Sequence, residues 1–190
     1  MQKWKRVHTA EGPRFRSSFT PHEAAVLNNV MQSLLSMLDE REAAAPEDEL
    51  EQITGIKTGH ATPPQEATLR RLLPDFHRPD QPTAATESLN SALRSLHEPQ
   101  IIAAKRGAAR RLLRTVPAEG GRCELTEEDA HAWVAAVNDL RLALGTMLEI
   151  GPHGPDRLPG DHPLAGHLDV YQWLTFLQEY LVVTLMEKRA

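Results

Sequence analysis

The sequence predicts a mostly α-helical fold, a single-domain bundle of five to six helices with a small antiparallel β element. Its 190 residues are 41% hydrophobic, which is enough to build one core, and we expect one domain spanning 1–190. Apolar residues recur with helical spacing through long stretches, above all 133–150 and 170–185. The first twenty residues and residues 122–125 alternate instead, as strands do.

The N-terminal segment is predicted to form a β-hairpin. In RFRSSF, Phe15 and Phe19 fall on one face of a strand, whereas Arg14 and Arg16 fall on the other. KWKRVHT is the expected partner strand, joined to it across the turn AEGP.

The first helix is predicted to begin at TPHE. Thr20 can accept a hydrogen bond from the backbone N–H of Glu23, whose side chain can reach back, and Pro21 suits the first helical position. Apolar residues then cover one half of the helix through about Glu42.

Prolines and glycines interrupt the middle of the chain. Residues 45–66 combine acidic side chains with Pro and Gly and are predicted to be a flexible linker. A short helix in EATLRRLLPDF should stop before Pro74. The next helix, TAATESLNSALRSLH, is expected to end around Pro99, unless Pro99 lies in the first turn of the following helix, which runs to Val116.

The C-terminal third begins with a short strand. RCEL, residues 122–125, could add this strand to the hairpin, and Thr126 then caps a long helix. Residues 151–167 are rich in Gly and Pro and are predicted to be a loop. The last helix should run from about Leu168 to Lys188.

The apolar helix that starts at Thr126 carries polar residues along its edge. Asn138, Arg141 and Gly145 form a narrow stripe beside the apolar face, and Asp139 is expected on the far side. We favour a structural role in which Arg141 reaches a partner and fixes how this helix docks. The alternative is a ligand or partner site made of Asn138, Asp139 and Arg141. Gln178 on the last helix also needs a hydrogen-bond partner, and Arg141 is the candidate.

Bulk composition excludes several classes of function. The formal net charge of −5 does not attract nucleic acid or anionic membranes, so such binding would need a local basic patch. No apolar run approaches the roughly 18 residues of a membrane span, and the basic start MQKWKRVHTAEG lacks the apolar stretch of a signal peptide. We expect a cytoplasmic protein that does not bind membranes. The single Cys123 excludes an internal disulfide and a cysteine-built zinc site.

A basic run, KRGAARRLLR, is the best surface candidate. Arg106, Arg110 and Arg114 recur every four residues on one helix face, with Arg111 beside them. Such a row could contact successive phosphates or an acidic protein surface. The alternative, which we favour, is a solvated face with ordinary ion pairs. Lys105 projects from the apolar side and is expected to snorkel or to pair with a carboxylate in the core.

The hairpin adds basic residues of its own. Arg14 and Arg16 join Lys3, Lys5 and Arg6 against a single acidic residue of the hairpin. A basic β-ribbon near a basic helix could contact DNA without reading its sequence. No stretch has the pattern of a helix-turn-helix recognition pair.

Four segments, taken in order, carry a family resemblance: RLLPDFHRPD, KRGAARRLLRTV, CELTEEDAHAWVAAVNDLRLALGTMLEI and VYQWLTFLQEYLVVTL. NDLRLALG and WLTFLQEY are the most specific parts. With the N-terminal strand and first helix, these segments resemble the actinobacterial oxidative-stress regulator (AosR-like) family over nearly the whole chain. The resemblance implies a transcriptional regulator of the oxidative-stress response that works with an alternative sigma factor in thiol and cysteine metabolism.

The chain departs from that family at its cysteines. The resemblance implies that the redox-sensing member switches through an internal disulfide between two nearby cysteines, whereas Cys123 stands alone here. We favour a structural role for Cys123, packed behind the sheet with Leu125. The alternative is a peroxide-responsive thiol that forms an intermolecular disulfide, which would need exposure and a pKa lowered by neighbours such as Arg122.

Metal binding and catalysis have little support. His153, His162 and His167 share the late loop with acidic residues, but their spacing follows no known zinc site. We find no Gly-rich phosphate loop, no GxSxG serine and no HExxH motif. We therefore expect no cofactor, no metal and no enzymatic activity.

The leading hypothesis is a non-enzymatic regulator of oxidative-stress transcription. Given the resemblance, it would act through contacts with a sigma factor or RNA polymerase, with DNA contact through a local basic patch as an addition. Two alternatives remain: an interaction adaptor unconnected with transcription, and a small-molecule sensor with a pocket between helices. The sequence leaves a homo-oligomer open.

Overall fold

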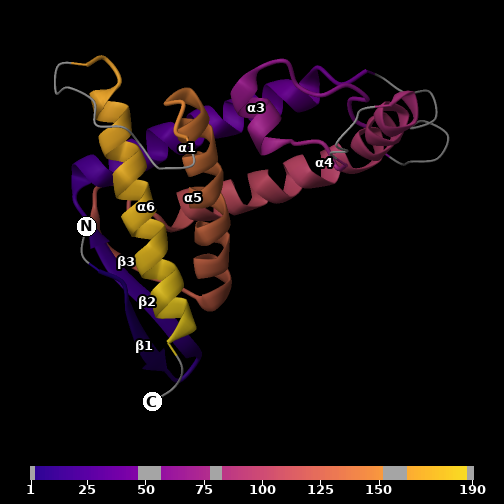
Figure 1. Ribbon diagram of the computed structural model, residues 1–190. Coiled ribbons are helices and arrows are strands. Elements are labelled where there is room, and N and C mark those ends of the chain that lie inside the picture. The colour runs from indigo at the N-terminus through magenta and orange to yellow at the C-terminus, as the bar shows by residue number, and fades with distance from the viewer. Residues whose placement is uncertain (1–2, 47–56, 78–82, 152–161, 188–190) are drawn as a thin grey trace.

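A computed structural model describes residues 3–46, 57–77, 83–151 and 162–187 (Figure 1). In these parts the chain forms a three-stranded antiparallel sheet and five helices, which confirms the predicted fold class. The strands are β1 (Lys5–Thr9), β2 (Gly12–Phe19) and β3 (Gly121–Leu125). The helices are α1 (Pro21–Ala43), α3 (Ala67–Leu72), α4 (Ala84–Thr115), α5 (Glu127–Met147) and α6 (Ala165–Met186).

The sheet has the order β1-β2-β3, so the predicted hairpin and the predicted strand near 122–125 are both present. Phe15 pairs with Leu125 in the ladder, and both side chains are fully buried. Arg16 pairs with Lys5 on one side and with Glu124 on the other. The alternation along β2 therefore separates an apolar inner face from a charged outer face, as its sequence predicts.

Two long helices begin at the predicted caps. Thr20 and Glu23 form a reciprocal capping box at the start of α1, where Pro21 occupies the first turn. Thr126 and Asp129 form the same arrangement at the start of α5. Each box satisfies two backbone N–H groups that the helix itself leaves without partners.

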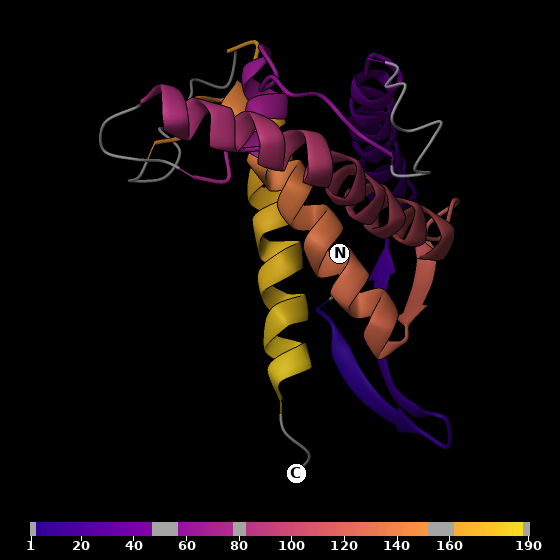
Figure 2. The same cartoon turned by 90° about the vertical axis from the view of Figure 1, so that its right-hand side faces the viewer.

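Helix α5 lies at the centre of the molecule (Figures 1 and 2). It packs against α4 on one side and α6 on the other, and it also contacts α1, α3 and the sheet. Trp133 of α5 is fully buried, and its ring lies 5.6 Å from that of Trp4 and 5.7 Å from that of Phe19, centroid to centroid. Its indole N–H donates to Thr115 Oγ1 at 2.7 Å. The two strongly apolar stretches of the sequence, 133–150 and 170–185, thus fall largely on α5 and α6, which pack against each other.

Helix α4 corrects one prediction, because it continues through Pro99 instead of ending there. A proline lacks the N–H that would bond to the carbonyl four residues earlier, here that of Ser95. Gly59 supplies the missing donor, since its backbone N–H lies 2.8 Å from the Ser95 oxygen. The helix bends along its length (Figures 1 and 2), as a proline inside a helix requires.

The predicted linker at 45–66 lies partly outside the described residues, at 47–56. Its described end is fixed to two helices: Gly59 bonds to α4, and the His60 ring and Arg41 backbone oxygen are 2.7 Å apart. The predicted loop at 151–167 likewise falls outside the described residues at 152–161, and α6 begins three residues earlier than predicted.

One hydrophobic core is shared by the sheet and all five helices of the described chain. No helix in these parts combines the length and the apolar character needed to cross a membrane.

Candidate functional site

The basic run on α4 divides into paired and unpaired arginines. Arg106 reaches across to α1, where its Nε lies 2.7 Å from Asp39 and its guanidinium also bonds to Glu42. Hydrogen bonds from Lys57 and then Arg106 hold the pKa of Glu42 below its ordinary value. Arg106 therefore has a structural role, since it joins α4 to the end of α1.

Arg111 is also engaged within the chain. Its Nε lies 2.5 Å from Asp129, and its Nη1 donates to Glu128. Burial would raise the pKa of Asp129, but hydrogen bonds from Thr126 and Arg111 outweigh it and hold that pKa below its ordinary value. Arg111 thus ties α4 to the negatively charged first turn of α5.

Arg110 and Arg114 differ from both. Their side chains are exposed, and no ion pair or hydrogen bond joins either to the described residues. They line a groove of about 690 Å³ between α1 and α4. We call this feature the α1/α4 groove; its lining residues are Gln32, Leu35, Ser36, Asp39, Arg110, Leu113 and Arg114.

The hairpin arginines are partly neutralised by acidic neighbours. Arg14 lies 2.7 Å from Glu11, and Arg16 bonds to Glu124 across the sheet. Arg6, on the inner side, donates to the backbone oxygen of Glu187 at 2.6 Å and so holds the end of α6 against β1. It is not available to a partner.

A second hollow, of about 350 Å³, lies beside β1, β2 and β3. We call it the sheet hollow; its lining residues are Lys3, Lys5, Arg16, Ser17, Ser18 and Arg122. Arg122 is well exposed and lies 3.9 Å from Glu124, too far for a strong ion pair. The sheet hollow is therefore basic, although Glu124 offsets part of its charge.

Arg141, the charged member of the stripe on α5, is engaged within the chain. Arg141 donates to Thr175 Oγ1 at 3.0 Å and to Gln178 Oε1 at 2.5 Å, and Gln178 in turn donates to the Val134 oxygen at 3.0 Å. These contacts join α5 to α6, with Gln178 as the predicted partner. In the described part of the chain, no hydrogen bond joins Asn138 to Arg141.

Asp139 lies on the other side of α5 from Arg141, as expected, and it is buried there. It is 5% exposed, and its Oδ1 lies 2.6 Å from Lys105 Nζ on α4. Burial raises the pKa of Asp139, while Lys105 opposes the shift. The side of α5 that carries Asp139 is covered by α4, as the side that carries Arg141 is covered by α6, so this carboxylate lies away from solvent. Asp139 is the core carboxylate that Lys105 was expected to find.

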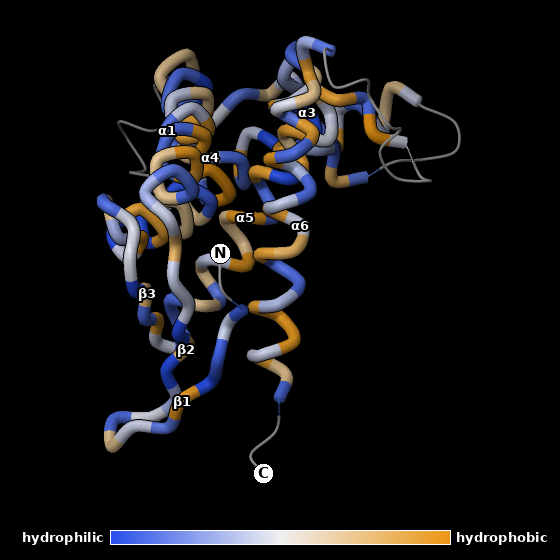
Figure 3. Tube along the Cα trace, turned by 90° about the vertical axis from the view of Figure 1, so that its left-hand side faces the viewer, coloured by the Kyte–Doolittle hydropathy of each residue, from blue (hydrophilic) through white to orange (hydrophobic). Residues whose placement is uncertain are grey.

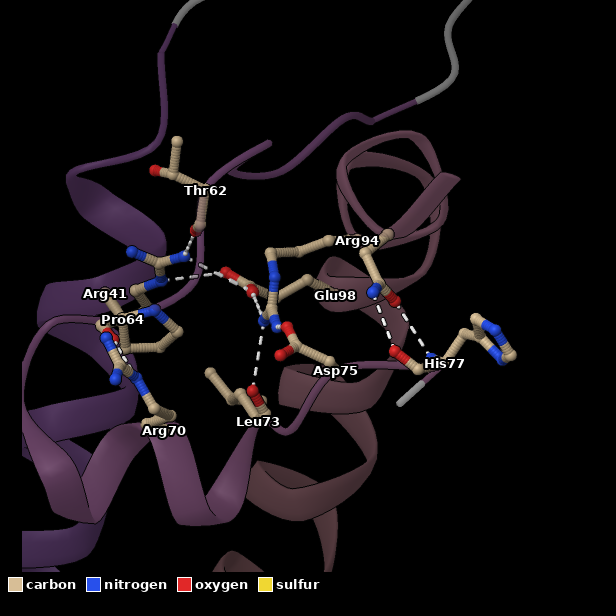
Figure 4. A network of polar contacts seen from close by, with 10 residues as sticks. Arg41, Thr62, Pro64, Arg70, Leu73, Asp75, His77, Arg94 and Glu98 are labelled. Carbon is tan, nitrogen blue, oxygen red and sulfur yellow. Dashed lines mark hydrogen bonds and ion pairs between the residues drawn. The ribbon is translucent and has the colours of Figure 1, made fainter. Parts of the chain in front are cut away.

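A polar network that the sequence analysis missed lies between α1, α3 and α4 (Figure 4). Arg94 of α4 is almost fully buried and donates to Glu98 at 2.9 Å, to the Leu73 oxygen at 3.0 Å and to Asp75 at 2.8 Å. Glu98 also accepts from Arg41 of α1 at 2.8 Å. The i,i+4 spacing of Arg94 and Glu98 was the one available signal, and it also describes an ordinary surface pair.

Cys123 is buried on the inner face of the sheet. Its side chain faces the core, and its thiol lies 3.5 Å from the Thr115 oxygen. Burial, with a smaller contribution from Asp129, raises the pKa of the thiol to about 12. A thiol in this environment stays protonated at neutral pH, whereas reaction with peroxide requires the thiolate.

The predicted histidine-rich loop falls largely outside the described residues, including His153. His162 accepts a hydrogen bond from the backbone N–H of Leu164 at 3.2 Å and so supports the turn before α6. Within the described ranges, no group of three or more His, Cys, Asp or Glu side chains could hold a metal ion.

Comparison with known proteins shows the family to which the chain belongs. A model of a domain of unknown function, DUF2017, matches residues 1–185. The chain is 66% identical over 196 residues to a Mycobacterium tuberculosis protein named oxidative stress regulator AosR (strain H37Rv). That match covers all of this chain and 90% of the relative.

Two further mycobacterial proteins give the same picture. A Mycobacterium bovis protein with the same name is 66% identical with the same coverage. A Mycobacterium leprae protein, named putative oxidative stress regulator AosR, is 61% identical over 193 residues, covering 98% of this chain and 89% of its own. No solved structure matches the chain.

Proposed function

This chain belongs to the DUF2017 family, and on that premise we propose that it is a non-enzymatic regulator of the oxidative-stress response. One observation carries the proposal: 66% identity, over the whole chain, to a mycobacterial protein named for that function. Identity at this level over matched lengths implies the same fold.

The regulator acts by binding a protein of the transcription machinery, a sigma factor or RNA polymerase. The described residues support binding better than catalysis. Two conspicuous buried charges, Arg94 and Asp139, are occupied by partners within the chain, whereas a catalytic acid or base must reach a substrate. Two arginines instead face solvent in the α1/α4 groove, which is the arrangement of a recognition surface.

Contact with DNA is a second candidate, favoured by the sheet hollow. Its basic side chains, Lys3, Lys5, Arg16 and Arg122, come from all three strands or directly precede them. Such a patch could hold phosphates without reading bases. If it does, affinity for duplex DNA should fall with salt, and Lys5→Ala with Arg122→Ala should reduce the slope by about one per lost contact.

The deciding experiment is co-purification from a mycobacterial host, before and after a pulse of peroxide. We expect a tagged copy of the protein to retain a sigma factor or RNA polymerase subunits, and loss of the gene to weaken transcription of oxidant-induced genes. Retention of an unrelated protein, with transcription unchanged, would favour the adaptor. A melting temperature that rises with a metabolite would favour the sensor.

A further inference from the structure

The α1/α4 groove lies between α1 and α4, which lie side by side (Figure 3). Its lining residues come from the second half of each helix. Leu113 of α4 is partly buried and gives it apolar surface, whereas Leu35 of α1 is only 7% exposed and belongs to the core beneath. Gln32 and Ser36 stand exposed on the α1 side, and Arg110 and Arg114 stand exposed on the α4 side. One wall is therefore neutral and polar, and the other is cationic.

The positive charge of the α4 wall is not cancelled within the described chain. Asp39, the one acidic residue of the lining, lies 2.7 Å from Arg106; Arg106 also bonds to Glu42, whose second partner is Lys57, so these two cations and two carboxylates balance each other. Arg110 and Arg114 make no ion pair with any described residue. Two guanidinium groups, each with five N–H donors, thus face the groove on a chain whose net charge is −5.

The spacing of these arginines points to the shape of the ligand. Residues i and i+4 lie about 6 Å apart along a helix, so both guanidinium groups follow the axis of α4. The exposed part of Leu113 beside a cationic wall suits an amphipathic helix that buries an apolar residue and turns carboxylates to one side. A phosphate backbone would use the arginines alone and leave the exposed part of Leu113 uncovered.

We propose that the α1/α4 groove binds an acidic, amphipathic helical segment of a protein partner. That the partner belongs to the transcription machinery rests on the proposed function. That the segment is acidic and amphipathic rests on the groove alone. Carboxylates of the segment would pair with Arg110 and Arg114, and an apolar side chain would cover the exposed part of Leu113.

Site-specific photo-crosslinking in a mycobacterial host tests the proposal. A benzoylphenylalanine at Gln32 places the probe in the groove, and one at exposed Gln172 of α6 is the remote control. We expect the benzoylphenylalanine at position 32 to cross-link to a partner peptide rich in Asp and Glu, which mass spectrometry identifies. The probe at position 172 should not capture that peptide.

Charge reversal provides the second arm. R110E with R114E should lower the cross-linked yield at Gln32 by about tenfold or more, since truncation or reversal at a desolvated charge pair costs at least that much affinity. R71E, which changes an exposed arginine of α3 outside the groove, should leave the yield unchanged. Circular dichroism and melting temperature verify that each variant folds.

The outcomes separate this inference from the proposed function. A cross-link to nucleic acid, to a basic segment, within the same chain only, or none at all overturns the groove proposal. So does retention of a sigma factor or polymerase that R110E with R114E does not weaken, although the proposed function then stands. An acidic segment from a protein outside transcription supports the groove and overturns the proposed function.

Discussion

The two halves of α4 use arginine in opposite ways. In the N-terminal half, the Arg94 side chain is 2% exposed and is satisfied by Glu98, Asp75 and the Leu73 oxygen. In the C-terminal half, Arg110 and Arg114 are exposed and unpaired within the described chain. The residue type is the same, so the difference comes from what the fold places opposite each side chain. A buried arginine locates its helix, whereas an exposed one remains available to a partner.

The buried polar network in the N-terminal half of α4 requires charged side chains to lose their hydration, and it forms in only one geometry. Removing a charged group from water costs several kcal/mol of free energy, and this desolvation is offset only when every charge in the network has a partner. Here Arg41, Glu98 and Arg94 link α1 to α4, and Asp75 and Leu73 bring in the chain just after α3. The network therefore selects one relative position for three segments.

The largest expected effect is at Arg94. Arg94→Met should lower the free energy of unfolding by roughly 3–5 kcal/mol, because it leaves the buried Glu98 with one partner fewer and the Leu73 oxygen without its donor. Urea unfolding measures the change, with Arg110→Met as the matched control on the same helix. A loss below about 1 kcal/mol would mean that the network contributes little.

The second-largest effect on stability is expected at Gly59, whose backbone N–H bonds to the Ser95 oxygen where α4 passes through Pro99. A Cβ at this position would lie 2.9 Å from Pro99 Cδ, so Gly59→Ala should destabilise by roughly 1–3 kcal/mol through crowding. Pro99→Ala removes the ring, and the double variant should recover part of the loss in a double-mutant cycle. Strict additivity of the two changes would show that the contact is not the cause.

Glu42 gives a smaller effect that depends on pH. Its pKa lies below the ordinary 4.5, through hydrogen bonds from Lys57 and Arg106, so it contributes stability above about pH 4.5. That contribution disappears as the pH falls through the lowered pKa. Glu42→Gln should therefore cost up to about 1 kcal/mol at pH 7 and less at pH 3. Exposed Glu179→Gln is the control, and a cost that grows toward pH 3 would contradict the assignment.

The smallest expected change in stability is at the exposed end of α4. Arg110→Ala with Arg114→Ala should shift the melting temperature by no more than about 2 °C, since neither side chain has a partner in the described chain. Scanning fluorimetry measures the shift. A larger drop would show that these arginines stabilise the fold, and the contrast between the two halves of α4 would then fail.

Much of the fold was predictable because its causes are local. The capping box of Thr20 and Glu23 spans three residues, and the alternation of Phe15 with Arg16 needs no knowledge of the rest of the chain. The same holds for the cap at Thr126 and for the short helix that ends before Pro74. Even the pairing of Arg141 with Gln178 could be anticipated, since both lie on the edges of strongly apolar helix faces.

The candidate site was predictable only as a set of residues. The spacing of Arg106, Arg110 and Arg114 predicts that they share one face of a helix. It does not predict that this face lies beside α1. Whether each guanidinium group has an ion-pair partner depends on Asp39, Glu42 and Asp129, which lie on other helices. The sequence analysis could not divide the run into paired and unpaired members.

The sequence by itself determined where helices and strands begin, which faces are apolar and to which family the chain belongs, because these depend on residues within a few positions or on the pattern as a whole. The tertiary structure alone decided that α4 crosses Pro99, that Asp139 is buried and that Arg110 and Arg114 are available. Each of these depends on a group distant in the chain, such as Gly59 for Ser95 or Lys105 for Asp139. Short-range rules fix local conformation, but the state of a charged side chain depends on what folding brings to face it.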